Sequence, residues 1–231
     1  MFSRYKLLTN DECNQMVADL TKLPWASGMA PGALYREKVK GNDEIAFKMS
    51  KETAVADQHM QVISRKVMEN KFVRSRIFAN NMVNPRFNLY QNGGFYGKHA
   101  DSAFMGDSRK QVRTDISMTL FLTDPDEYEG GEICLEYASG ETFQLKEPKG
   151  TMLFYPAGVM HEVKPVTKGK RIAFVAWIES HIQDPQQRDI LTEISQLCDD
   201  MMATPELALG DFHTKALNVK HNLFRQWWRG S

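Results

Sequence analysis

The sequence predicts a mainly β domain with flanking helices, of the sandwich, jelly-roll or barrel type. Residues 83–178 consist of short runs rich in β-branched and aromatic side chains, separated by turn residues. Apolar side chains at helical spacing precede and follow that stretch. The chain has 231 residues, enough for one large domain with helical additions. No second globular domain is required.

The N-terminal part, residues 1–82, is expected to be a mixed, largely helical support region. Thr9 and Glu12 have the spacing of a capping box and precede an apolar stripe, which predicts a first helix. A second helix is expected over residues 51–69, where it would cover a sheet. Residues 25–48 are interrupted by glycine and proline and are predicted to form short strands and loops.

The central part, residues 83–180, is expected to contain the sheets. The candidate strands are Arg86–Tyr90, Asp115–Leu122, Glu132–Glu136, Thr142–Leu145, Thr151–Phe154, Val159–Val163 and Arg171–Ile178. Within the second of these runs, Ser117 and Thr119 alternate with apolar residues. One face of that strand should therefore point at something polar, and the other at packing helices or a second sheet.

The C-terminal part, residues 181–231, is expected to be a helical extension. Asp184 and Pro185 suit the cap and first turn of a helix that carries a continuous apolar stripe. Residues 212–228 are predicted to form another helix. These helices should pack on the sheet or form a subunit contact, so a homo-oligomer is among the possibilities.

Charge and cysteine content restrict the classes of partner. Lys+Arg and Asp+Glu number 29 each, and no five like charges occur in a row. Nothing therefore indicates a nucleic-acid groove or an anionic membrane surface. The three cysteines are odd in number and far apart, which speaks against a zinc or disulfide framework. With neither a signal-peptide pattern nor a bilayer-length apolar run, we expect a soluble cytoplasmic protein.

The stretch Phe87–Asp101 carries the first sign of chemistry. His99 and Asp101 are two residues apart after a glycine turn, so in extended chain both side chains project from one face. A His-x-Asp pair alone is more often an ordinary polar turn than a metal site. His161, at the start of a predicted strand, can supply a third ligand from across the sheet. Arg171 begins the next strand.

Two histidines and one carboxylate leave open metal positions, the arrangement of non-haem Fe(II) oxygenases. The planar fork of Arg171 could hold one carboxylate of a diacid whose other end chelates iron, which indicates 2-oxoglutarate. Two alternatives stay open, a zinc hydrolase and a non-catalytic metal- or small-molecule-binding jelly roll. The hydrolase is disfavoured because no general base accompanies the ligands and Arg171 would have no role.

Several segments resemble the PKHD-type hydroxylases, relatives of the prolyl 4-hydroxylase catalytic domain. They are HAD, RTDISMTLFLTDPDEYEGGEICLE and LFYPAGVMHEVKPVTKGKRIAFVAWIES, with PWASGMAPG near the start and LNVKHNLFRQWW near the end. The resemblance covers nearly the whole chain. It implies a double-stranded β-helix (jelly roll) that binds one Fe(II) and consumes 2-oxoglutarate and O₂. The products would be succinate, CO₂ and a hydroxylated substrate, with L-ascorbate as a reductant.

The resemblance also assigns residues. His99, Asp101 and His161 match the iron ligands, and Arg171 matches the 2-oxoglutarate anchor. The presence of the carboxylate favours hydroxylation over the halogenation of related enzymes that lack it. Tyr90 matches a tyrosine often found near the cosubstrate.

Thr119 and Ser117 are weaker candidates, supported by the polar face of their strand. The loop 102–113 is either a lid over the metal or an ordinary connection. The substrate is expected to be a small molecule or a peptide, of unidentified chemistry.

Overall fold

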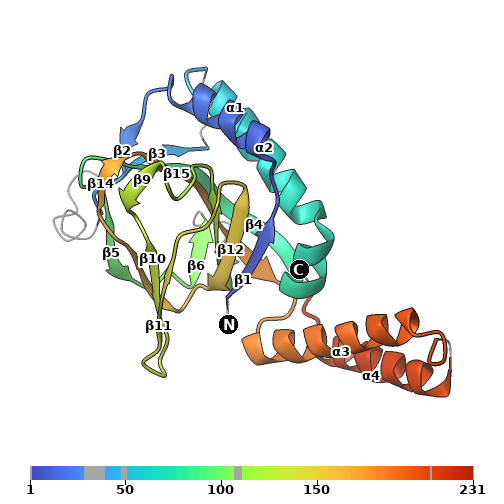
Figure 1. Ribbon diagram of the computed structural model, residues 1–231. Coiled ribbons are helices and arrows are strands. Elements are labelled where there is room, and N and C mark those ends of the chain that lie inside the picture. Colours follow the sequence, from blue (N-terminus) through green and yellow to red (C-terminus); the bar gives the residue numbers. More distant parts are fainter. Residues whose placement is uncertain (1, 29–39, 48–50, 107–110, 209, 231) are drawn as a thin grey trace.

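The computed structural model describes residues 2–28, 40–47, 51–106, 111–208 and 210–230. Two antiparallel sheets enclose a shared interior, and helices flank them (Figure 1). The larger sheet has the strand order β1 (Ser3–Lys6), β12 (Thr151–Pro156), β8 (Ile116–Phe121), β15 (Arg171–Ser180), β4 (Ala79–Tyr90), β3 (Asp43–Ala46) and β2 (Ala26–Ser27). The smaller sheet has the order β11 (Thr142–Leu145), β10 (Ile133–Glu136), β13 (Met160–Val163) and β5 (Tyr96–His99). The predicted jelly roll is confirmed.

The strands predicted in the central part are all present, and several are longer than predicted. β4 begins at Ala79 and β15 continues to Ser180. The strands that were not predicted include β1, β9 (Tyr128–Gly130) and β14 (Val166–Gly169). β1 is an exposed edge strand, and β9 and β14 pair only with each other. Strands of three or four residues are too short to show a clear alternation of polar and apolar side chains. Pairing with strands distant in the sequence stabilises them.

Two helices cover the outer face of the larger sheet. α1 (Asn10–Leu20) begins with the predicted capping box, and α2 (Ala54–Glu69) runs beside it. The apolar faces of both helices pack on outward-facing residues of β8 and β15 to form the main core. The inward face of β8 instead carries Ser117 and Thr119, which are 2 % and 3 % exposed. The predicted division of this strand into a polar and an apolar face is therefore correct.

The predicted loop 102–113 contains a small β-ribbon. β6 (Phe104–Gly106) pairs with β7 (Gln111–Arg113), and Met105 lines the interior cavity of the barrel. Residues 107–110, which the sequence analysis included in this loop, lie outside the described residues. Whether the segment acts as a lid stays a prediction.

The C-terminal part forms a helical hairpin that projects from the barrel (Figure 1). α3 (Pro185–Ala203) and α4 (Asp211–Trp227) pack against each other, and their barrel-proximal end packs on Phe78. As predicted, Asp184 caps α3 by accepting from the backbone N–H groups of Gln186 and Gln187. In the described part of the chain, no helix has the length and apolar character needed to cross a bilayer.

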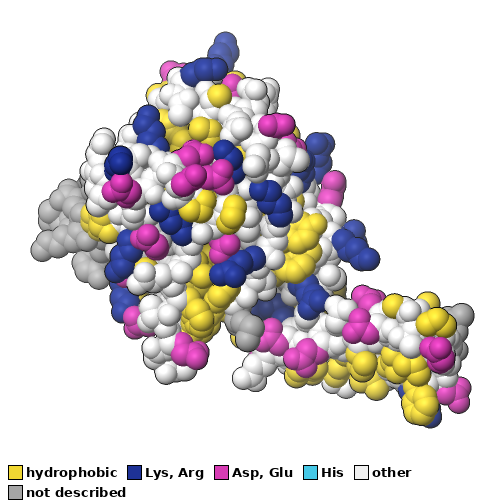
Figure 2. Space-filling model, in the orientation of Figure 1, with side chains coloured by type: hydrophobic (Ala, Val, Ile, Leu, Met, Phe, Trp, Pro, Cys, Tyr) yellow, Lys and Arg dark blue, Asp and Glu magenta, His cyan; other side chains and the backbone are white. Residues whose placement is uncertain are grey.

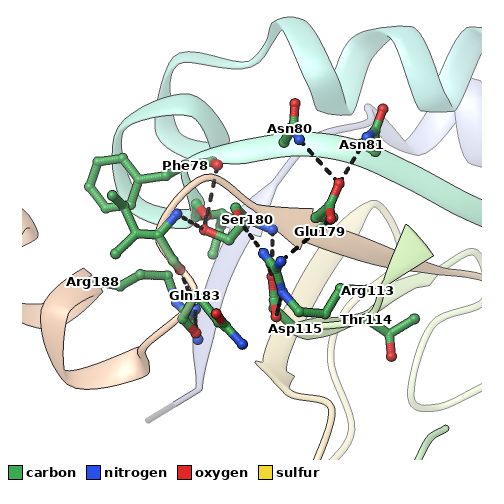
Figure 3. Close-up of polar contacts among 12 residues, drawn as sticks. Phe78, Asn80, Asn81, Arg113, Thr114, Asp115, Glu179, Ser180, Gln183 and Arg188 are labelled. Carbon is green, nitrogen blue, oxygen red and sulfur yellow. Dashed lines mark hydrogen bonds and ion pairs between the residues drawn. The ribbon is translucent and has the colours of Figure 1, made fainter. Parts of the chain in front are cut away.

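A polar network joins the hairpin to the barrel (Figure 3). Arg113 makes a two-pronged contact with Asp115, at 2.7 and 2.9 Å, and donates to the carbonyl of Ser180 at 2.9 Å. The backbone N–H of Ser180 donates to Asp115 at 2.8 Å. Arg188 of α3 donates to the carbonyls of Ile182 and Gln183. These bonds fix the direction in which the hairpin leaves β15.

Candidate metal centre and cosubstrate pocket

His99, Asp101 and His161 meet on the wall of the barrel interior. His99 ends β5 and His161 lies directly opposite it on β13. Asp101 follows two residues after His99, so its carboxylate reaches the same point. One ligand atom from each of the three residues lies within 4.8 Å of the others. We call these three residues the ligand cluster.

The hydrogen bonds of the two imidazoles determine which ring nitrogen faces the cluster. Nδ1 of His99 lies 2.7 Å from the carbonyl of Gly97, and Nδ1 of His161 lies 2.9 Å from the carbonyl of Val159. A carbonyl only accepts, so in each neutral ring Nδ1 carries the proton and Nε2 keeps its lone pair. These Nε2 atoms lie 3.7 and 3.6 Å from the carboxylate oxygens of Asp101. Three acceptors therefore face one another, an arrangement that suits a cation between them.

Neighbouring side chains hold the cluster in place. The hydroxyl of Ser117 donates a hydrogen bond to Oδ2 of Asp101, and the backbone N–H of Asp101 donates to the carbonyl of Ala157 at 3.1 Å. The ring of Tyr96 stacks on His99 with centroids 3.8 Å apart. A carboxylate and an imidazole restrained in this way lose little freedom when a metal binds.

Burial is the main cause of an unusual protonation equilibrium at His99. Burial and, to a smaller extent, the proximity of His161 together lower the pKa of this imidazole from 6.5 to about 4. His99 is therefore neutral at physiological pH, which is the form that binds metals.

Arg171 lines the same interior and is 1 % exposed. Its guanidinium is flanked by the rings of Tyr90 and Phe121, each with its centroid 5.0 Å from Cζ. Among the atoms that the structure describes, Nε and Nη2 of Arg171 are buried without a hydrogen-bond partner. A buried guanidinium with unpaired donors is costly, and a carboxylate would satisfy it through two parallel hydrogen bonds.

Gly131 has no side chain, and this leaves room for Arg171 to reach its position. Gly131 has φ +72°, a conformation that favours glycine. A Cβ atom there would lie 2.9 Å from Cδ of Arg171 and 2.8 Å from Cγ2 of Val166. The turn between β9 and β10 therefore needs glycine both for its backbone angle and for the arginine that passes beside it.

Tyr90 and Thr119, predicted near the cosubstrate, both line the cavity. Tyr90 is paired with Arg171 across β4 and β15. Burial raises the pKa of Tyr90 to about 12, against the opposing effect of Arg171, so its hydroxyl keeps its proton and can donate. Thr119 lies on β8 with its hydroxyl on the inner face of the strand and is 3 % exposed.

One cavity of about 430 Å³ connects the ligand cluster with Arg171. Its walls between them include Tyr90, Thr119 and Tyr155. Beside the cluster the cavity is also lined by Arg86 and Trp177, and the guanidinium lies 5.3 Å from the indole ring centroid. An elongated dianion could therefore reach from the cluster to Arg171, and a second molecule could bind beside the cluster.

Sequence reasoning gave too little weight to three residues of this site. Ser117 was a weak candidate but contacts Asp101 directly. Tyr155 alternates with Leu153 on β12, a signal that could have placed it in the interior. Tyr96 could not have been found, because it is three residues from His99 and ideal alternation would place it on the opposite face. A register shift between β13 and β5 accompanies its stacking on His99.

Comparisons with known proteins agree with this geometry. The family model of the 2OG-Fe(II) oxygenase superfamily matches residues 85–179. A PKHD-type hydroxylase from Pseudoalteromonas atlantica is 36 % identical over 96 % of both chains.

Solved structures show the same fold at low identity. A prolyl-4-hydroxylase from Pseudomonas putida aligns with a TM-score of 0.57 and 19 % identity over 78 % of this chain and 92 % of that one. A prolyl hydroxylase from Trichoplax adhaerens, in complex with a hypoxia inducible factor peptide fragment, has a TM-score of 0.56 and 14 % identity. That alignment covers 82 % of this chain and 86 % of the Trichoplax chain.

Proposed function

Because the chain belongs to the PKHD-type hydroxylases, we propose that its ligand cluster holds Fe(II) and that Arg171 holds 2-oxoglutarate. The protein is a 2-oxoglutarate- and Fe(II)-dependent oxygenase that hydroxylates a substrate. The observation that carries the residue assignment is that one cavity contains both a group of acceptors suited to a cation and a cation suited to a carboxylate. Three acceptors face one another in one part of it, and buried cationic donors are unpaired in another.

The chain's own residues would bind and orient the reactants. The ligand cluster offers three atoms that can coordinate a metal. It leaves the side that faces the cavity for a chelating cosubstrate. Fe(II) bound there supplies the oxygen chemistry by which 2-oxoglutarate and O₂ become succinate and CO₂ while the substrate gains a hydroxyl group. Arg171 would pair with the distal carboxylate, and the protonated Tyr90 hydroxyl could donate a further hydrogen bond.

The remaining assignments are part of the same proposal. O₂ is the oxidant and L-ascorbate the reductant that keeps the metal ferrous. The substrate, a small molecule or a peptide, would bind near Arg86 and Trp177, because these residues line the cavity beside the ligand cluster. We propose the reducing cytoplasm as the compartment, since Cys13, Cys134 and Cys198 are free and buried.

The experiment that tests the proposal is anaerobic reconstitution with Fe(II) and 2-oxoglutarate, followed by exposure to O₂ with cell extract. Succinate should form, and mass spectrometry should find a compound that gains one oxygen atom. A zinc hydrolase or a non-catalytic jelly roll would form no succinate under these conditions. Zn(II) in place of Fe(II) is the matched control and should support no turnover.

A further inference from the structure

The hairpin of α3 and α4 exposes large apolar side chains in two stripes. Ile190 and Leu197, seven residues apart on α3, are 46 % and 48 % exposed. Phe212 and Val219, seven residues apart on α4, are 70 % and 50 % exposed. A spacing of seven residues returns to the same side of a helix. Figure 2 shows apolar side chains gathered along the edge of the hairpin that points away from the barrel.

Both stripes lie on one face of the hairpin. On α3, the exposed Ile190 and Leu197 immediately precede Leu191 and Cys198, which are buried. On α4, the exposed Phe212 immediately precedes the buried His213. Each stripe is therefore displaced by one residue, about 100° of rotation, in the same sense from the buried side of its helix. Because the two helices are antiparallel, this equal displacement places both stripes on the same side of the plane that contains the two helix axes.

The described part of the chain leaves this face uncovered. The network of Figure 3 holds the start of α3 to β15 through Ser180 and Arg188, so the hairpin cannot fold back freely onto the barrel. An exposed and contiguous apolar surface on a rigid support is typical of a protein interaction site. We call it the hairpin face and define it by Ile190, Leu197, Phe212 and Val219.

The charges of the two helices indicate what covers the face. α3 carries four carboxylates, Asp189, Glu193, Asp199 and Asp200, against the single Arg188. α4 carries the three cations Lys215, Lys220 and Arg225 against the single Asp211. A second copy offers an acidic helix for the basic one and a basic helix for the acidic one at the same time. Such self-complementarity is the requirement of a two-fold interface.

We propose that the hairpin face is the interface of a homodimer. In the dimer, α3 of each copy lies antiparallel against α4 of the other, so that the four helices form a bundle. The alternative two-fold arrangement would place α3 on α3 and bring the acidic helices together. With 19 residues in α3 at about 1.5 Å each, the face is about 28 Å long and, two helices wide, about 20 Å broad. That footprint, about 560 Å², is close to the roughly 600 Å² per partner at the lower end of specific, stable interfaces.

Sedimentation velocity over a concentration series tests the dimer, with wild type compared with Val219→Asp and Val55→Asp. Val55 is the matched control, because it is also a helical valine, 40 % exposed, but lies on α2 away from the hairpin. Val219→Asp buries a charge in the proposed interface and should raise the dimer dissociation constant by about 30-fold or more. Val55→Asp should leave it within about twofold. Circular dichroism and succinate formation of each variant show that the barrel remains folded.

Charge reversal tests the identity of the partner helix. Lys215→Glu together with Lys220→Glu makes α4 acidic and should weaken the dimer. Adding Glu193→Lys and Asp200→Lys reverses α3 as well and should restore much of the dimerisation, because the complementarity returns with opposite sign. Wild type that stays monomeric up to about 100 μM, well above the range of specific dimers, would overturn the proposal whatever else binds the face. A dimer that Val219→Asp leaves unchanged, or that the second reversal weakens further, would overturn it as well.

Discussion

The barrel interior and the hairpin depart from the usual distribution of side chains in opposite directions. The interior buries a cation, Arg171, at 1 % exposure, whereas the hairpin exposes Phe212 at 70 %. Buried charge and exposed apolar surface both cost free energy in an isolated chain. In the barrel, a charged small molecule of defined shape would offset this cost. On the hairpin, a second apolar surface would offset it.

The contrast also concerns rigidity. Each side chain of the ligand cluster is held by neighbours from the strands and their connections, including the carbonyls of Gly97 and Val159 and the hydroxyl of Ser117. The hairpin is joined to the barrel through Phe78, the network around Ser180 and a hydrogen bond from Arg76 to Gln196 of α3. Precise positioning therefore belongs to the barrel, and the hairpin needs only to present a face. Substitutions in the two regions should differ accordingly.

The largest effect is expected from removing a member of the ligand cluster. His99→Ala, Asp101→Ala and His161→Ala should each reduce succinate formation by more than about a hundredfold, since residues that merely orient a ligand already contribute 10- to 100-fold. Folding should survive, because the acceptors repel one another when no metal is bound. Turnover and thermal unfolding measured together on each variant separate the two effects. Three folded variants with wild-type turnover would show that the metal lies elsewhere.

A smaller effect is expected at Ser117, which orients Asp101 rather than meeting the metal. Ser117→Ala should weaken Fe(II) binding by about 10- to 100-fold without abolishing turnover at saturating metal. Ser195→Ala on α3 is the control from the hairpin and should change neither quantity. Anaerobic titration of Fe(II) measures the affinity, and succinate formation in the presence of O₂ at saturating Fe(II) measures turnover. Equal Fe(II) affinities in Ser117→Ala and wild type would mean that the hydroxyl does not position the carboxylate.

The smallest of these effects concerns pH and the metal-free protein. The unfolded chain protonates His99 at its ordinary pKa of 6.5, whereas burial holds the folded value at about 4. Between these values the unfolded state binds more protons, so the free energy of unfolding should fall as the pH drops from 6.5 to 4, by on the order of 2–3 kcal/mol.

Chemical denaturation in the presence of a chelator measures this loss. His99→Gln should flatten the pH dependence across that window. His221→Gln, an exposed position of α4, should not. Identical slopes for wild type and His99→Gln would mean that the imidazole is protonated as readily in the folded protein as in the unfolded chain.

Local pattern predicted much of the barrel and of its chemistry. The alternation of β8 predicted that Ser117 and Thr119 point inward, and the two-residue spacing predicted that His99 and Asp101 converge. The pairing of His99 with His161 needs a register between strands about sixty residues apart in the chain, which no local pattern specifies. The contact of Tyr96 with His99 accompanies an irregularity in the same pairing and was equally out of reach.

The hairpin shows a different limit. The apolar stripe of α3 was visible in the sequence, but Ile190 and Leu191 are adjacent and chemically alike. The packing of Phe78, Ile182 and α4 decides that Leu191 is buried, while Ile190 stays exposed. Periodicity predicts that a helix has an apolar side. It does not predict how much of that side the same chain covers.

The most direct test of the central claim is calorimetric titration of 2-oxoglutarate into anaerobic, Fe(II)-loaded wild type, Arg171→Ala and Arg171→Lys. The account predicts that Arg171→Ala raises the dissociation constant of 2-oxoglutarate by about ten- to a thousandfold, because the distal carboxylate loses its bidentate partner in a buried site. Arg171→Lys should fall between the two, since it keeps the charge without the fork. Fe(II) affinity should be the same in all three proteins. A folded Arg171→Ala protein that binds 2-oxoglutarate as tightly as wild type would contradict the claim that this buried, unpaired cation is the cosubstrate anchor.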